Sequence, residues 1–215
     1  MFTEHFKHVT NWVFDLDHTL YPPESQLFDQ IENKMTNYII ENIGLDSLSA
    51  SKLRQRYWQV YGTTLAGLLK EHRIDPEPFL LQVHQIDFSI LKPDPELGAV
   101  INALPGRKIV YTNGTIPYAR DVLKALQIES VFDAVYGIES AKYCPKPEKR
   151  AFDTVFNKDN INTVNGAMFE DDARNLVVPK KLGMRTILVT PDCEIQSEYV
   201  DFVTSDLTSF LRQIV

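Results

Sequence analysis

The sequence contains only two cysteines, Cys144 and Cys193, and no CxxC pair. A disulfide-stapled secreted fold is therefore not expected, and so few thiols suit a reducing compartment. No run of about 18 uncharged apolar residues occurs, as a membrane-spanning helix would need. Residues 1–10 mix charged and polar side chains into the segment where a signal peptide has its apolar core. We expect a cytoplasmic protein that does not associate with a membrane.

Positive charge is also scarce, since 22 Lys and Arg face 29 Asp and Glu for a net charge of −7. No Lys/Arg run is long enough to offset that charge against a phosphate backbone or an anionic lipid surface. A nucleic acid polymer is therefore a poor candidate for a partner. The remaining composition, with 44% apolar residues in a chain of 215, is that of an ordinary globular protein with one domain or one plus a small second.

The N-terminal third changes from a strand pattern to helical patterns. Residues 12–14 form a short β-prone segment that ends in Asp15 and Asp17. An apolar stripe with a spacing of four follows, as expected for an amphipathic helix that Gly44 ends: Leu27, Ile31, Met35, Ile39 and Ile43. Further helices are predicted over residues 47–70, with an interruption at 61–64, and over 76–84. Residues 21–94 are thus predicted to form a small helical domain.

After residue 95 the pattern alternates between strands and helices. Strands are predicted at 107–112, 132–136, 167–169, 185–189 and 201–204, with helices at 116–127, 147–156, 173–182 and from about 205. Short strands joined by helical crossovers favour an α/β fold with a doubly wound, mostly parallel, Rossmann-like sheet. Residues 1–20 and 95–215 are predicted to form this core, and the helical domain is inserted after its first strand.

Unusual polar residues follow several of the predicted strands. Asp15 and Asp17 follow the first, Thr112 and Asn113 the second, and residues 170–172 form an acidic run after a later one. In a parallel sheet the carboxyl ends of the strands meet at one edge, where ligands collect. Several carboxylates placed together need a counter-charge, and oxygen ligands without a Cys or His cluster favour Mg²⁺ over Zn²⁺. We therefore predict a magnesium site.

The same residues suggest phosphoryl transfer. Asp15 and Asp17 are two residues apart, so both side chains can reach one substrate. One carboxylate can attack phosphorus and form an aspartyl-phosphate, while the other exchanges protons with the leaving oxygen and with water. Lys146, between two prolines, and Thr112 with the Asn113 turn can bind the phosphate oxygens.

Four segments resemble, in order, the four motifs of the haloacid dehalogenase superfamily of phosphohydrolases: residues 14–20 (FDLDHTL), 111–114 (YTNG), 145–147 (PKP) and 169–175 (FEDDARN). This resemblance implies that Asp15 is the nucleophile and that Asp17 is the general acid/base. It implies that Asp15, Asp17 (through its backbone carbonyl) and Asp171 hold Mg²⁺, and that the second and third motifs hold the phosphate through Thr112, Asn113 and Lys146. The helical insertion looks like the mobile cap of this family.

Residues 12–17, 20–22, 61–65, 169–171 and 173–176 together look most like the pyrimidine 5′-nucleotidase branch. This resemblance implies a pyrimidine nucleoside 5′-monophosphate such as UMP or CMP as substrate, contacted by Tyr21, Tyr61 and Thr63. The sequence departs from the branch at His18, where Asn is expected, and it has an additional acid at Asp172, for which a helix N-cap is the simplest role.

Other functions share these motifs. A sugar-phosphate or phosphoglycolate phosphatase, or a phosphomutase, would differ only in the cap and in the fate of the intermediate. A non-catalytic phosphate-ligand sensor would retain the fold. Halide release from 2-haloacids is disfavoured, because that chemistry needs neither a metal nor the Asp17 and Asp171 pair.

Overall fold

The computed structural model describes residues 2–192 and 194–215, so Cys193 lies outside the described residues. Within them, six strands form one sheet in the order β3-β2-β1-β4-β5-β6, and every neighbouring pair is parallel. The strands are β1 (Asn11–Phe14), β2 (Arg107–Tyr111), β3 (Ala134–Tyr136), β4 (Gly166–Glu170), β5 (Arg185–Val189) and β6 (Phe202–Thr204). The predicted doubly wound parallel sheet is confirmed.

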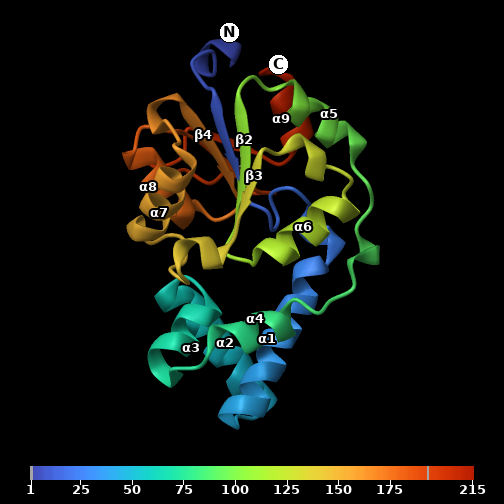
Figure 1. Ribbon diagram of the computed structural model, residues 1–215, viewed down its shortest axis with the longest axis vertical. Helices are drawn as coiled ribbons and strands as arrows, with labels where there is room; N and C mark the ends of the chain where they lie inside the picture. The colour runs from blue at the N-terminus through green and yellow to red at the C-terminus, as the bar shows by residue number, and fades with distance from the viewer. Residues whose placement is uncertain (1, 193) are drawn as a thin grey trace.

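Helices cover both faces of this sheet (Figure 1). They are α5 (Pro95–Ala103), α6 (Ile116–Ala125), α7 (Lys149–Asp159), α8 (Ala173–Lys181) and α9 (Leu207–Arg212). Because successive side chains of a strand point to opposite faces, Trp12 and Phe14 of β1 pack into the core layer that holds α5, α6 and α9. Val13 packs with α7 and α8 on the other face. The central strand β1 is therefore buried on both sides.

Helix α5 is the one core helix that the sequence pattern did not predict. Pro93 precedes this helix and Pro95 is its first residue, and two prolines this close together are typical of a linker. Asp94 instead caps the helix by accepting a hydrogen bond from the Leu97 N–H at 2.9 Å, and Pro95 occupies the first turn, where it is tolerated. Leu97 and Ile101 are buried. The segment that resembles a linker therefore begins a helix of the core.

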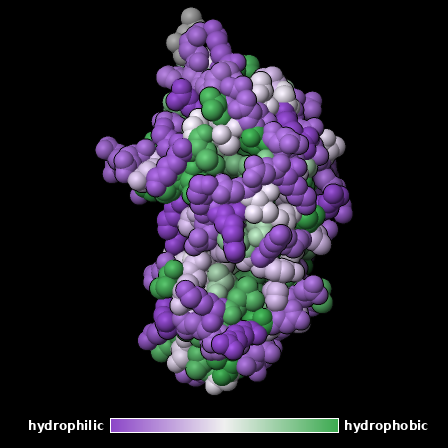
Figure 2. Space-filling model, turned by 60° about the vertical axis from the view of Figure 1, so that its left-hand side comes forward, coloured by the Kyte–Doolittle hydropathy of each residue, from purple (hydrophilic) through white to green (hydrophobic). Residues whose placement is uncertain are grey.

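Four further helices form a separate group at the carboxyl edge of the sheet, at the bottom of Figure 1. They are α1 (Leu27–Ile43), α2 (Ser47–Tyr61), α3 (Thr64–His72) and α4 (Pro76–Val83), and they pack on one another. The predicted helices and the break at 61–64 are confirmed. Gly44 ends α1 with φ 81°, a conformation that glycine adopts without strain. Figure 2 shows a mainly hydrophilic face with apolar patches over both its upper and its lower part.

Gly62 and Arg174 take part in two of the contacts between the four-helix group and the core. Gly62, at φ +84°, lies so close to the loop of Lys146 that a Cβ atom would stand 3.0 Å from the Pro147 Cδ and 3.1 Å from the Lys146 oxygen. Arg174 of α8 donates a hydrogen bond to the backbone oxygen of Trp58 at 3.2 Å, and its guanidinium lies 4.0 Å from the centre of the Trp58 ring. The domain boundaries at residues 21 and 94 stay a prediction.

None of the helices in the described ranges combines the length and the apolar character needed to cross a bilayer.

Candidate active site

A cavity of about 820 Å³ lies between the carboxyl edge of the sheet and the four-helix group. All six residues predicted for catalysis, phosphate binding or metal binding line it: Asp15, Asp17, Thr112, Asn113, Lys146 and Asp171. They come from the loops after β1, β2 and β4 and from the loop before α7. The parallel topology thus assembles residues that are far apart in the sequence, as the strand-end argument predicted.

Lys146 is the electrostatic centre of the site. Its Nζ donates hydrogen bonds to Asp15 Oδ1 at 2.6 Å, to Glu170 Oε2 at 2.6 Å and to the Tyr111 oxygen at 3.1 Å. The side chain is only 1% exposed. Burial alone would lower the pKa of Lys146, but Asp15 and Glu170 raise it. Since these acceptors engage all three ammonium donors, Lys146 holds the carboxylate of Asp15, the predicted nucleophile, in place, and its contact with a phosphate stays a prediction.

Glu170 is a site residue that the sequence prediction did not include. It is the last residue of β4 and is 1% exposed. Its position at the end of a fully buried strand, directly before Asp171, was the available signal, because an acid buried there needs a cation. Its pairing with Lys146 makes it part of the same charge cluster as Asp15.

Asp15, Glu170 and Asp171 each offer a carboxylate oxygen within 4.8 Å of the others. Burial and the charge of Glu170 raise the pKa of Asp15 to about 8. Burial and Asp171 raise the pKa of Glu170 to about 8, and burial raises the pKa of Asp171 as well. A buried set of oxygen ligands with more negative charge than Lys146 can balance fits a divalent cation such as Mg²⁺.

This cluster predicts that stabilisation by Mg²⁺ depends on pH. Without metal, the folded protein keeps protons on Asp15 and Glu170 up to about pH 8, whereas unfolded carboxyls release them near pH 4. Stability therefore falls as the pH rises between these values. Because Mg²⁺ binds the ionised carboxylates, we expect saturating Mg²⁺ to raise the Tm by roughly 5 °C or more at pH 8 and by much less at pH 5.5.

Thermal unfolding with Mg²⁺ and with EDTA at the two pH values measures this difference. Asp171→Asn should reduce the shift, and Asp153→Asn is the matched control, since Asp153 pairs with Lys149 on an exposed face of α7. An equal Mg²⁺ shift at both pH values would contradict the proposed ligand set.

Two tyrosines hold Asp17. The hydroxyls of Tyr21 and Tyr118 each donate a hydrogen bond of 2.5 Å to Asp17 Oδ1. His84, directly after α4, stacks on the Tyr118 ring at 4.5 Å, and burial raises the pKa of Asp17 despite the hydroxyl donors. Tyr21 was predicted to contact substrate, but its side chain is buried and its hydroxyl is bound to Asp17. Both hydroxyls are thus engaged with Asp17, the substrate contact of Tyr21 stays a prediction, and Tyr118 was not predicted.

The phosphate-loop residues also bind one another. The Thr112 hydroxyl accepts a hydrogen bond from the Gly114 N–H at 2.9 Å. The Asn113 side chain accepts from the Lys146 N–H at 2.8 Å and donates to the Lys146 oxygen at 3.2 Å. Asn113 thereby joins the second and third motifs. Its side chain is used for this contact, which leaves its backbone N–H as the group to meet a phosphate.

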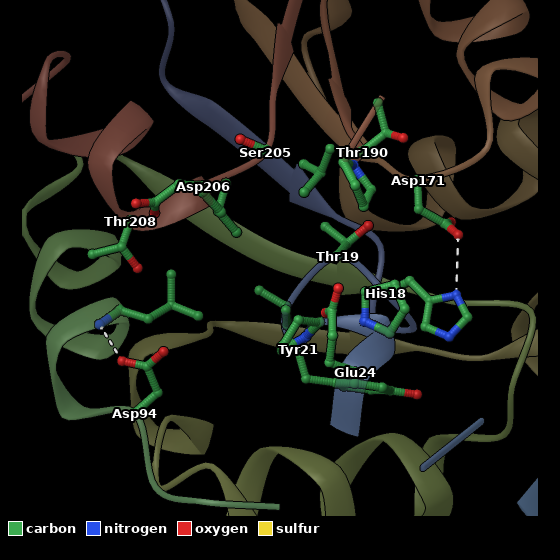
Figure 3. Close-up of a pocket in the computed structure, with 17 residues that line it drawn as sticks. His18, Thr19, Tyr21, Glu24, Asp94, Asp171, Thr190, Ser205, Asp206 and Thr208 are labelled. Carbon is green, nitrogen blue, oxygen red and sulfur yellow. Dashed lines mark hydrogen bonds and ion pairs between the residues drawn. The ribbon is translucent and has the colours of Figure 1, made fainter. Parts of the chain in front are cut away.

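The two residues that depart from the branch pattern have distinct surroundings. His18, at φ 59°, faces Asp171 with 3.5 Å between Nδ1 and Oδ2 (Figure 3). Burial opposes the charged form, but Asp171 raises the pKa of His18. Both residues also line a second cavity of about 510 Å³. Asp172 accepts a hydrogen bond from the Arg174 N–H at 3.0 Å, so its predicted role as the N-cap of α8 is confirmed.

The predicted cap residues differ in position. Thr63 lines the large cavity, but its hydroxyl oxygen accepts a hydrogen bond from the Ala66 N–H at 3.1 Å and caps α3. Tyr61 is not among the residues that line the cavity, and its hydroxyl donates to Glu71 at 2.8 Å within the helical group. The substrate contact of Tyr61 stays a prediction, which would require its side chain to turn toward the cavity.

Comparison with known proteins assigns the class. The family model of the haloacid dehalogenase-like hydrolases matches residues 12–183, and the chain belongs to this family. Among curated proteins, Phosphate metabolism protein 8 of Saccharomyces cerevisiae is 28% identical over 214 residues, which cover 90% of this chain and 65% of that protein. The chain thus spans less than two thirds of that relative's length.

Solved structures share the fold. A haloacid dehalogenase-type phosphatase from Thermococcus onnurineus has a TM-score of 0.64 at 16% identity and covers 96% of this chain and 97% of its own. A hydrolase of the same type from Bacillus subtilis, solved with magnesium, has a TM-score of 0.60 at 15% identity. The match covers 97% of this chain and 99% of the Bacillus chain. An L-2-haloacid dehalogenase from Xanthobacter autotrophicus with covalently bound chloropropionic acid has a TM-score of 0.60 at 16% identity. The match covers 96% of this chain and 98% of the dehalogenase. At identities this low, the similarity shows that the fold is shared and shows nothing about activity.

Proposed function

We propose that the protein is a Mg²⁺-dependent phosphate-monoester hydrolase that acts through an aspartyl-phosphate on Asp15, with a pyrimidine nucleoside 5′-monophosphate as substrate. The observation that carries the proposal is the buried cluster in which Lys146 binds Asp15 and Glu170 beside Asp171. A hydrolase of this family that only displaced halide would not need these additional buried acids, whose desolvation is costly.

The residues of the chain divide the reaction into two steps. Asp15 attacks phosphorus, and the ester P–O bond breaks as Asp17 gives its proton to the leaving oxygen. Asp17 then takes a proton from water, whose oxygen attacks phosphorus, and the bond between phosphorus and Asp15 breaks to release phosphate. Asp15, Asp171 and the backbone carbonyl of Asp17, with Glu170 beside them, would hold Mg²⁺, which would supply charge that neutralises the carboxylates and the phosphate.

Tyr21 and Tyr118 support this proposal because they fix the carboxyl group of Asp17, which must serve both steps from one position. The four-helix group, residues 21–94 in our proposed division, acts as the cap over the site. Its contacts with the core at Gly62 and Arg174 lie beside the cavity, where a moving cap would meet the core. Closure would exclude water from the first step.

The size of the cavity supports a leaving group as large as a nucleoside, since about 820 Å³ falls in the upper part of the range for small-molecule sites. The pyrimidine base is the most specific part of the proposed substrate. It rests on the resemblance of residues 12–17, 20–22, 61–65, 169–171 and 173–176 to the pyrimidine 5′-nucleotidase branch.

Phosphate release from UMP, CMP, AMP, GMP, phosphoglycolate and hexose phosphates, with Mg²⁺ and with EDTA, tests the proposal. We expect metal-dependent release that favours UMP and CMP by at least about tenfold in kcat/KM, as selective binding of the leaving group requires. Metal-dependent release that favours another ester would support the proposed hydrolysis mechanism and refute a pyrimidine nucleotide as the substrate. No release from any ester, in protein that still binds UMP, would favour the phosphate-ligand sensor.

A further inference from the structure

An ion pair of the four-helix group lines the cavity that also holds Asp15 and Asp17. Arg54 of α2 and Glu32 of α1 both line the cavity, and the Arg54 Nη1 lies 2.5 Å from Glu32 Oε1. The Arg54 side chain is 12% exposed and that of Glu32 is 40% exposed. Among the described residues, the buried Nε of Arg54 has no hydrogen-bond partner. The Arg54 side chain is thus mostly removed from water while Glu32 stays partly exposed, and the Arg54 guanidinium is incompletely satisfied.

Apolar side chains of α1 and α4 line the same cavity as this pair: Phe28, Ile31, Met35, Phe79, Leu80 and Val83. Such a wall suits a leaving group with apolar faces, because the faces gain from leaving water. Within it, Arg54 and Glu32 offer a strong donor and a strong acceptor side by side.

The charge of this wall limits what can bind there. Glu32 already balances Arg54, and Asp29, which also lines the cavity, adds a negative charge. Lys146 cannot help a distant anionic group, because its ammonium is bound to Asp15 and Glu170. A leaving group with a second phosphate or a carboxylate would therefore meet net negative charge without a free cation among the described residues that line the cavity.

We propose that the Glu32–Arg54 pair is the subsite that binds the leaving group, and that it selects a neutral, hydrogen-bonding leaving group such as a nucleoside over one that carries a second anionic group. A carbonyl oxygen of the leaving group accepts from Arg54, and an N–H or hydroxyl donates to Glu32. This inference rests on the proposed function and specifies how the enzyme selects its substrate. The pair attracts neutral leaving groups and repels those that carry a second anionic group.

The test compares kcat/KM for UMP with that for phosphoglycolate in the wild type, Arg54→Gln and Glu32→Gln, all with Mg²⁺. For Arg54→Gln we expect kcat/KM with UMP to fall by about 10- to 100-fold, in line with the loss of a charged hydrogen bond. For Glu32→Gln we expect the value for phosphoglycolate to rise by roughly fivefold or more, because the repelling charge is gone, while the value for UMP falls. The ratio of the two substrates should shift strongly in Glu32→Gln.

Matched controls exist on the same two helices. Arg56→Gln on α2 alters an exposed residue that pairs with Glu71, and Glu41→Gln on α1 alters an exposed partner of Gln82. Neither residue lines the cavity, so neither change should shift the substrate ratio.

Two results would overturn the inference. One is an equal loss for both substrates in Arg54→Gln and Glu32→Gln, which indicates damage to the cap alone. The other is an unchanged ratio in both variants. If the wild type releases no phosphate from any ester, the proposed function fails separately, and the Kd for UMP decides the subsite: a tenfold weaker Kd in Arg54→Gln supports it, and an unchanged Kd refutes it.

Discussion

Asp15→Asn should abolish phosphate release, with a loss of roughly 10⁴-fold or more in kcat, as expected when a nucleophile is removed. The amide is nearly isosteric with the carboxylate but cannot attack phosphorus. It still accepts a hydrogen bond from Lys146, which keeps its second partner, Glu170. We therefore expect a folded protein with a Tm close to that of the wild type. Steady-state phosphate release and thermal unfolding measure the two effects.

Trapping with acid distinguishes this loss from a general defect. Quenched wild-type enzyme should carry phosphate on Asp15, as shown by mass spectrometry of the peptide, and Asp15→Asn should carry none. Asp153→Asn serves as the control, because it makes the same chemical change at the exposed pair with Lys149 and should retain full activity. Normal turnover by Asp15→Asn would refute Asp15 as the nucleophile.

Lys146→Met should reduce both stability and activity. The ammonium is bonded to Asp15 and Glu170 at 2.6 Å each and is 1% exposed. Above about pH 8, where Asp15 and Glu170 are ionised, its removal leaves two buried carboxylates without their cation, and breaking a buried ion pair in this way costs about 3–5 kcal/mol. Activity should fall by at least about 10²-fold, since charge at the reacting phosphate is lost. Chemical denaturation gives the free energy of unfolding, and kcat/KM gives the catalytic loss.

A second substitution separates the two effects. Adding Glu170→Gln to Lys146→Met removes one unpaired charge and should recover part of the lost stability without restoring activity, a coupling that a double-mutant cycle quantifies. Lys149→Met, at an exposed residue of α7, is the matched control. If Lys146→Met unfolds at the same denaturant concentration as the wild type, the buried cluster does not have the energetic role assigned to it.

Much of the fold and of the site could be predicted from local sequence patterns. The apolar spacing from Leu27 to Ile43 and the cap at Gly44 define α1 because a helix repeats every 3.6 residues. The alternation of strands and helices after residue 95 predicted the parallel sheet. Asp15 and Asp17, after a buried strand, were found because the ends of parallel strands meet at one edge, which is a property of topology that a sequence pattern already contains.

Contacts between distant segments could not be predicted in this way. Lys146 binds Asp15 across 131 positions of the chain, and Tyr118 binds Asp17 across 101. No local periodicity encodes which side chains will meet over such separations. The same holds for Arg54 and Glu32, which lie on two different helices, and for Tyr61, whose hydroxyl binds Glu71 within the helical group.

The sequence by itself determined the class of chemistry, because residue types at strand ends fix which ligands and nucleophiles are available. Only the tertiary structure decided how these groups are paired: Lys146 with Asp15 and Glu170, Asp17 with two tyrosines, and Glu32 with Arg54. The physical reason is that burial makes an unpaired polar group costly, so each of these groups takes the partner that the packing of distant segments brings within reach.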